Sequence, residues 1–81
     1  MELLEEAKKV VSRMHGLYDS PVKEIMERTE LSRPTVSKFF NLEKVRPSSE
    51  ETIYELCLDL IEAKETKRKA LVARSKEILE N

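Results

Sequence analysis

The chain has 81 residues, enough for one domain built around one modest hydrophobic core. Hydrophobic residues make up 40% and charged residues 38%, with one glycine and three prolines, which argues against disorder and low complexity. The net charge is −1, the acidic start lacks a basic signal region, and no apolar run reaches the roughly 20 residues that span a bilayer, so we expect a soluble cytoplasmic protein.

Residues able to carry chemistry are sparse. Cys57 is the only cysteine and lies between two leucines, which predicts a buried, inert thiol and rules out an intrachain disulfide. His15 is also alone, near the end of the first expected helix. The two residues form neither a zinc site nor a nucleophile–base pair, and no glycine-rich phosphate loop is present. We therefore expect no enzyme, with no catalytic residue, no metal and no cofactor.

Helical patterns begin at the start of the chain. The first helix is expected from Glu2 to about His15, with Gly16 marking its C-terminus. Ser20 is a candidate cap for a second helix that starts with Pro21 and reaches about Thr29. The residues expected to face inward from these two helices are Leu3, Leu4, Ala7, Val10, Val11, Met14, Val22, Ile25 and Met26.

A third helix is predicted from Arg33 to about Asn41. Ser32 can cap it by accepting from a backbone N–H, and Pro34 is tolerated in its first turn. Its apolar face, at i, i+3 and i+4 spacing, consists of Val36, Phe39 and Phe40. Its opposite side presents the polar residues Arg33, Ser37, Lys38 and Asn41. The helix thus combines an apolar face that can pack into the core with an opposite row of hydrogen-bonding groups suited to a DNA major groove.

The segment Leu42–Pro47 is expected to be a loop, and Ser48 with Glu51 matches a capping box for a fourth helix. The residues of that helix expected to be buried are Ile53, Leu56, Cys57, Leu60 and Ile61.

The character of the chain changes after Ala63, where the polar run KETKRK precedes apolar residues at helical spacing. Those apolar residues are Leu71, Val72, Ile78 and Leu79. Either the fourth helix continues to about residue 80, or a fifth helix starts near Thr66; without Gly or Pro, propensity favours continuity. A continuous helix would need a second chain to cover its apolar end, which favours a homodimer with these four residues at the interface, whereas a folded-back helix would cover the first one.

These patterns predict an all-α fold: a compact four- to five-helix bundle with a central helix-turn-helix and a long C-terminal helix. Residues 1–63 would form the main domain, and residues 64–81 a helical extension.

Charge is unevenly distributed, because residues 28–46 carry five basic and two acidic residues, a net charge of +3. The acid is concentrated in the fourth helix, at Glu50, Glu51, Glu55, Asp59 and Glu62. A local basic surface can neutralise phosphates even on an acidic protein, since screening limits charge effects to about 10 Å.

The stretch from Val22 to Pro47 resembles the phage-repressor-like (Cro/Xre) helix-turn-helix domains, and SRPTVSKFFN is similar to the first helices of LacI-type repressors. The resemblance covers roughly residues 3–62. The matching residues are Ile25, Leu31, Ser32, Thr35, Val36, Ser37, Arg46 and Pro47. Met26 stands where the family often has alanine, and Glu30 where it usually has a turn glycine; a left-handed Glu30 would cost about 1–2 kcal/mol.

The resemblance implies a sequence-specific DNA-binding transcriptional regulator of the repressor type, with helix 33–41 in the major groove of double-stranded DNA. Arg33 is the candidate for bidentate contact with guanine, while Lys44 and Arg46 are candidate phosphate contacts. The whole predicted DNA-binding set is Ser32, Arg33, Pro34, Thr35, Ser37, Lys38, Asn41, Lys44 and Arg46.

A different class of function is compatible with the same fold. The domain could be a protein-interaction module, or an antitoxin-like protein that binds DNA through its bundle and a toxin or other protein through its apolar C-terminal helix. The chain could also be the DNA-binding part of a longer repressor.

Overall fold

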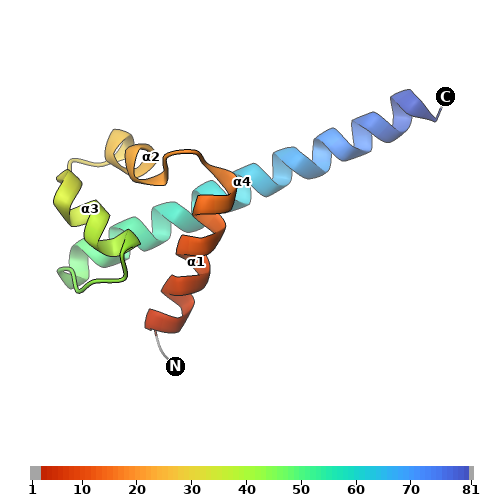
Figure 1. The fold of residues 1–81 in the computed structure, drawn as a ribbon. Helices are drawn as coiled ribbons and strands as arrows, with labels where there is room; N and C mark the ends of the chain where they lie inside the picture. Colours follow the sequence, from red (N-terminus) through yellow and green to blue (C-terminus); the bar gives the residue numbers. More distant parts are fainter. Residues whose placement is uncertain (1–2, 81) are drawn as a thin grey trace.

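The structure is a computed structural model that describes residues 3–80, and it contains four helices and no strand over that range. They are α1 (Leu3–Leu17), α2 (Pro21–Arg28), α3 (Arg33–Phe40) and α4 (Pro47–Leu79). The first three gather on the first half of α4, and the second half of α4 projects away from them (Figure 1). The predicted all-α bundle with a long C-terminal helix is confirmed, with four helices rather than five.

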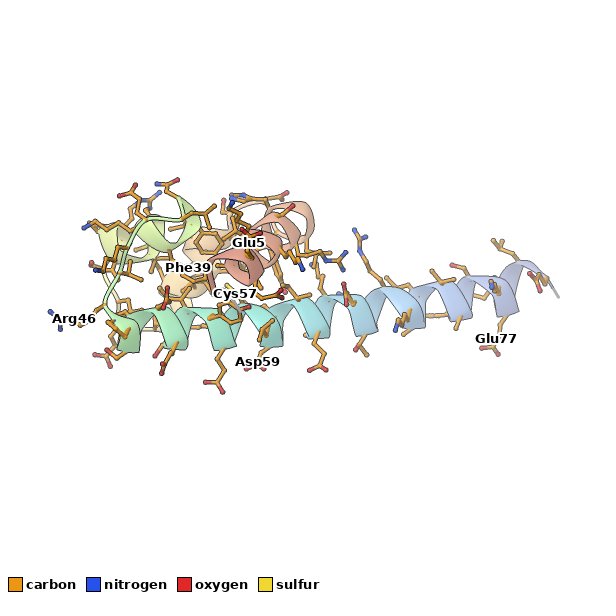
Figure 2. All side chains as sticks on the ribbon, turned by 90° about the horizontal axis from the view of Figure 1, so that it is seen from below. Glu5, Phe39, Arg46, Cys57, Asp59 and Glu77 are labelled. Carbon is orange, nitrogen blue, oxygen red and sulfur yellow. The ribbon has the colours of Figure 1, made fainter. Side chains whose placement is uncertain are left out.

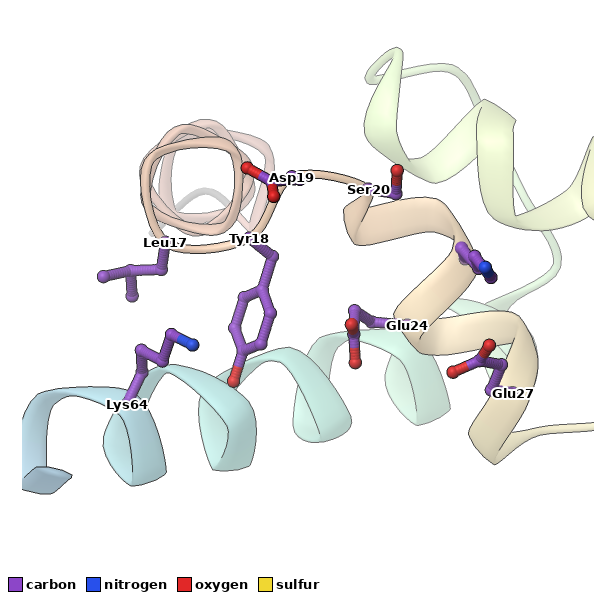
Figure 3. A pocket seen from close by; sticks show the side chains of 8 residues that line it. Leu17, Tyr18, Asp19, Ser20, Glu24, Glu27 and Lys64 are labelled. Atoms are coloured by element: carbon purple, nitrogen blue, oxygen red, sulfur yellow. The ribbon is translucent and has the colours of Figure 1, made fainter.

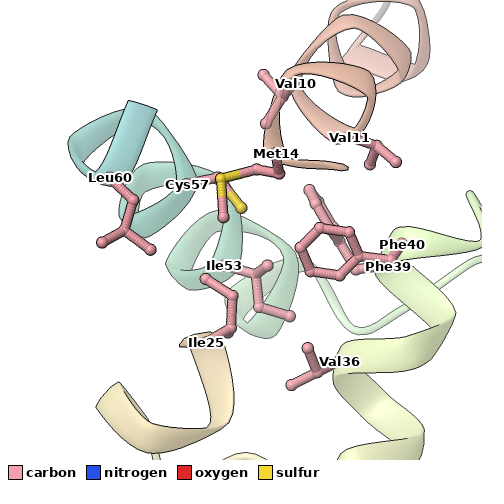
Figure 4. Packing of buried hydrophobic residues seen from close by; sticks show 10 residues of the cluster. All are labelled: Val10, Val11, Met14, Ile25, Val36, Phe39, Phe40, Ile53, Cys57 and Leu60. Atoms are coloured by element: carbon pink, nitrogen blue, oxygen red, sulfur yellow. The ribbon is translucent and has the colours of Figure 1, made fainter. Parts of the chain in front are cut away.

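The hydrophobic core receives side chains from all four helices (Figure 4). Met14 of α1, Ile25 of α2, Val36 of α3, and Ile53 and Cys57 of α4 are fully buried. The other members of the cluster are Val10, Val11, Phe39, Phe40 and Leu60. Because α3 contributes three of these side chains, its rotation about its own axis is fixed, and with it the direction of its polar face.

Polar contacts join the end of α1 to the middle of α4. The Tyr18 hydroxyl donates to the Leu60 carbonyl oxygen at 3.0 Å, and the Lys64 ammonium lies 4.8 Å from the centroid of the Tyr18 ring (Figure 3). Arg13 forms an ion pair with Glu65. Exposed charge pairs of this kind each stabilise a fold only slightly. The contacts of Lys64 and Glu65 lie where α4 leaves the bundle, because every described residue after Glu65 is exposed.

The end of α1 differs from the sequence prediction, and the predicted side-chain cap of α2 is not formed. The predicted start of the first helix at Glu2 lies outside the described residues. At its other end α1 continues through Gly16 to Leu17, and the Tyr18 amide donates to the Met14 carbonyl at 2.9 Å. Gly16 does not have a positive φ, so it is an ordinary helical residue and not a C-terminal cap. Ser20 precedes α2, but its side chain makes no capping hydrogen bond.

Both ends of α4 also bear on predictions. The capping box is wrong: α4 begins at Pro47, and Ser48 lies inside it, where its carbonyl accepts from the Thr52 hydroxyl at 3.0 Å. Proline suits the first helical position because its φ is already helical and it has no N–H to satisfy. The helix then runs past Ala63 without a break to Leu79. The continuous alternative is therefore confirmed, and a separate fifth helix folded back on α1 is wrong.

Candidate nucleic-acid interface

The turn between α2 and α3 is built on hydroxyl groups. The Thr29 hydroxyl donates to the Ile25 carbonyl at 3.0 Å and accepts from the Leu31 amide at 3.3 Å. Thr29 itself is extended, with φ −137° and ψ 171°. Glu30 is not left-handed, since Leu42 is the only non-glycine residue with positive φ among residues 3–80. Extended backbone held by a threonine side chain makes the turn without glycine.

Ser32 caps α3 as predicted. Its hydroxyl oxygen accepts from the Thr35 amide at 3.4 Å, and the two hydroxyl oxygens lie 3.0 Å apart. Pro34 occupies the first turn of the helix, where the absence of its N–H costs nothing. The cap therefore fixes where α3 begins, and so places Arg33 at its exposed N-terminal end.

The inner face of α3 is held by aromatic packing. Phe39 meets Phe40 edge to face, with ring centroids 5.5 Å apart, and meets Tyr54 of α4 in the same way at 6.4 Å. Phe40 in turn meets the exposed His15 of α1 at 5.9 Å. Such pairs add to the stabilisation from apolar burial and favour one relative orientation. The predicted apolar face of this helix is confirmed.

The outer face of α3 carries the predicted polar residues. Arg33, Pro34, Lys38 and Asn41 are exposed, and Thr35 and Ser37 are half-buried. No salt bridge or side-chain hydrogen bond found among the described residues occupies the guanidinium of Arg33 or the ammonium of Lys38. Both cations can therefore reach a ligand without first breaking a bond within the protein.

The segment after α3 returns towards that helix because of a left-handed residue. Leu42 has φ 63°. Its amide donates to the Phe39 carbonyl at 3.0 Å, and the Glu43 amide donates to the Lys38 carbonyl at 2.8 Å. This pair of hydrogen bonds is the Schellman pattern that ends many helices, usually with glycine in the left-handed position. The reversal directs Lys44 and Arg46 back beside the start of α3.

A groove of about 650 Å³ lies between the start of α3 and the α3–α4 loop. It is lined by Glu30, Leu31, Ser32, Thr35, Lys38, Lys44, Val45, Arg46, Pro47 and Ser49. We call it the basic groove, because it holds three cations, Lys38, Lys44 and Arg46, against the single carboxylate of Glu30. Five of the nine predicted DNA-binding residues line it, and the other four, Arg33, Pro34, Ser37 and Asn41, lie outside its lining. Those four belong to α3 or directly follow it.

Sequence reasoning missed the contribution of the first turn of α4. Pro47 and Ser49 line the basic groove, so the N-terminal end of a 33-residue helix opens onto it. The partial positive charge at a helix N-terminus favours an anion there and reinforces the three cations. The available signal was Pro47 as a first helical residue; the capping-box match at Ser48 obscured it.

The predicted interface residues of the C-terminal helix form no part of the bundle. Leu71, Val72, Ile78 and Leu79 have 51%, 55%, 64% and 82% of their surface exposed. They belong to the second half of α4, which extends beyond the other helices (Figure 1 and Figure 2). Large apolar side chains at this exposure are uncommon as a group on a monomer and often mark a binding surface.

The environment of Cys57 matches a structural role. Its side chain is fully buried, and burial raises the pKa of its thiol to about 12.

Within residues 3–80 no group of three or more His, Cys, Asp or Glu side chains is placed to hold a metal ion. No described helix is both long and apolar enough to cross a membrane.

Comparison with known proteins gives no family and no relative: no family model, no curated protein and no solved structure matches the chain. The geometry of the basic groove and of α3 is therefore what bears on function.

Proposed function

We propose that this chain is a sequence-specific regulator that binds double-stranded DNA through α2 and α3 as a helix-turn-helix. One observation carries the proposal: the basic groove opens beside the exposed polar face of α3, whose opposite face is anchored in the core. A rigid helix with free polar groups can enter a major groove, and neighbouring cations can hold the phosphates that flank it. The resemblance of residues 22–47 to Cro/Xre domains supports the same assignment.

The residues divide into two roles. Arg33 is exposed at the N-terminal end of α3, the end that reaches base edges in such domains, and its fork of donors fits guanine O6 and N7. Lys38 and Asn41 follow on the exposed side and can reach bases or phosphate. Lys44 and Arg46 lie in the loop that lines the basic groove and hold the DNA backbone.

The proposal includes a homodimer. One recognition helix reads only a few base pairs, too little for selectivity among a genome's competing sites, whereas a two-fold dimer reads two half-sites. The exposed apolar residues of the second half of α4 are the candidate interface.

The first test is the salt dependence of DNA binding, measured by mobility shift with a site obtained by selection from random duplexes. We expect Lys44→Ala and Arg46→Ala each to weaken binding to every sequence and to reduce the log–log salt slope by about 0.9. Lys8→Ala removes an exposed lysine on α1 and serves as the matched control. No retardation by the wild-type protein at low salt would contradict the proposal.

The second test separates base reading from phosphate binding. Arg33→Ala should weaken specific binding by about 1–3 kcal/mol and relax the preference at one base position. Repeating the selection with this variant measures that preference directly. An unchanged selected site would remove Arg33 from base recognition.

The exposed apolar end of α4 supports a second candidate, a module that binds another protein, as an antitoxin does. In that case, α4 would bind the partner and the basic groove would be incidental. Lys44→Ala and Arg46→Ala would then leave partner binding unchanged, whereas Leu71→Ser and Ile78→Ser would abolish it.

A further inference from the structure

The two halves of α4 carry opposite charge. Residues 47–63 contain five acidic and no basic residues, whereas residues 64–76 contain six basic and one acidic residue. Both halves belong to one continuous helix, so the separation of charge runs along a single axis. Two such helices side by side attract each other when antiparallel and repel each other when parallel.

One stripe of α4 carries apolar residues in both halves of the helix, on either side of Glu65. Leu58, Glu65, Val72 and Leu79 recur at intervals of seven residues, close to two helical turns, so they lie on one side of the helix. A seven-residue period suits two helices that wrap around each other with a slight left-handed supercoil. Leu58, with 47% of its surface exposed, lies in the acidic half, whereas Val72 and Leu79 lie in or beyond the basic half.

The neighbouring stripe selects the orientation of such a pair. Glu55, Glu62, Lys69 and Lys76 are also seven residues apart, and all four are exposed. Antiparallel pairing sets Glu55 against Lys76 of a second copy, and Glu62 against its Lys69. Parallel pairing would set each of these residues against its own kind, which is unfavourable across a helix interface.

A receiving surface exists on the acidic half. A shallow groove of about 340 Å³, here called the acidic groove, is lined by Glu51, Tyr54, Glu55 and Leu58. The groove lies on the flank of α4 beside the bundle, because the Tyr54 ring at its floor meets Phe39 of α3, whereas Asp59 points away from the bundle (Figure 2). An apolar floor with carboxylates at its rim is complementary to a helix that presents Val72 and Leu79 among lysines.

We propose that residues 66–79 of one copy, the tail segment, lie antiparallel in the acidic groove of a second copy. The two-fold axis passes beside Glu65, and both tail segments are seated at once because the contact is isologous. The two Glu65 carboxylates approach each other at the axis, and each is neutralised by the ion pair with Arg13 of its own chain. This inference rests on the homodimer within the proposed function but not on DNA binding, so its tests contain no DNA.

Disulfide trapping between full-length single variants distinguishes this arrangement from others. Leu58→Cys is mixed with Val72→Cys or, to allow for a shift of one turn, with Ser75→Cys, and oxidation products are separated on a non-reducing gel. We expect cross-linked dimers in at least one mixture and none from any single variant alone. The wild-type chain is the control, because Cys57 is buried. Cross-linking of Val72→Cys by itself, or no cross-link in either mixture, would overturn the proposal.

Charge reversal provides a second test that does not depend on cross-linking. Glu55→Lys and Lys76→Glu should each raise the dimer Kd about tenfold at low salt in sedimentation, because like charges then face each other. The double variant restores opposite charges and should return the Kd to within about threefold of the wild type. Glu27→Lys, the same charge change on α2, is the matched control. A double variant no tighter than the single variants would overturn the antiparallel pairing.

Discussion

The two halves of α4 contain similar apolar pairs with different fates. Ile53 and Leu60, seven residues apart, are buried in the core, whereas Leu71 and Ile78, also seven apart, keep more than half of their surface exposed. The spacing is the same, and both pairs belong to one unbroken helix. What differs is that α1, α2 and α3 pack around Ile53 and Leu60, whereas residues 66–80 are all exposed. Apolar periodicity thus predicts which side of a helix needs a partner, but not where that partner comes from.

Amide hydrogen exchange should show the largest difference between the two halves. Amides from Ile53 to Leu60 lie in the core region and should exchange only when the domain unfolds. Amides of the tail segment should open locally at low protein concentration, because an isolated helix shorter than about 15 residues is marginal in water. Mass spectrometry of exchanged peptides measures both. Equal protection of the two halves in the dilute protein would contradict this comparison.

Removing an aromatic ring tests how strongly the packed half depends on α3. Phe39→Ala deletes a buried ring that meets Phe40 and Tyr54 and should lower the free energy of unfolding by about 3–5 kcal/mol. That is a large part of the roughly 5–15 kcal/mol that stabilises a typical domain. Urea denaturation measures the change. Leu71→Ala, measured in dilute protein, is the matched control and should stay within about 0.5 kcal/mol of wild type.

The buried thiol makes the stability of the packed half depend on pH. The pKa of Cys57 is about 12 in the folded protein, against 9.0 for the free side chain. Below pH 9 both states hold the proton; between pH 9 and 12 the unfolded chain loses it first, so the free energy of unfolding falls as pH rises. The loss contributed by this group approaches roughly 4 kcal/mol at the upper end.

Urea titrations of the wild type and Cys57→Ala from pH 7 to 11 measure that contribution. The variant should be less sensitive to alkaline pH than the wild type, although it starts from a lower stability because of the cavity it creates. Desolvation also raises the pKa of Tyr54, but that group is common to both proteins and cancels in the difference. Parallel pH profiles would mean that the thiol is more accessible than its burial indicates.

Two glycine substitutions on either side of α3 should produce the smallest effects, with opposite signs. Leu42→Gly relieves a left-handed conformation and should stabilise the protein by about 0.5–1 kcal/mol after the extra unfolded-state entropy is subtracted. Glu30 does not have a positive φ, so Glu30→Gly should destabilise by about 0.4–1 kcal/mol. Denaturation midpoints of the two variants provide the check. Stabilisation by Glu30→Gly would contradict this prediction and would indicate a left-handed backbone at residue 30.

Local sequence signals were sufficient for much of the architecture. The apolar spacing of Val36, Phe39 and Phe40 predicted the buried face of α3, and the Ser32 cap predicted its start. The continuity of α4 followed from the absence of Gly and Pro after residue 47. Each of these features depends on residues within one or two helical turns, which is the range over which sequence patterns act.

The basic groove could not be predicted from such local patterns, because its residues come from separate segments of the chain. Lys38 lies near the end of α3 and Arg46 just before α4, and they share a groove only because Leu42 turns left-handed without a glycine to signal it. The turn before α3 likewise depends on two hydrogen bonds of the Thr29 hydroxyl. The sequence alone does not distinguish Thr29 from the other hydroxyl-bearing residues of this segment. Such features follow from tertiary packing that stabilises a locally unfavourable conformation.

The exposed second half of α4 has a consequence for the lifetime of the protein in a cell. In a lone chain residues 66–80 are all exposed, so proteases can cleave this segment through frequent local opening. Pairing removes that opportunity in proportion to the concentration of the protein. Surplus single chains would then be degraded faster than paired ones, so turnover itself would keep most surviving molecules in the paired form.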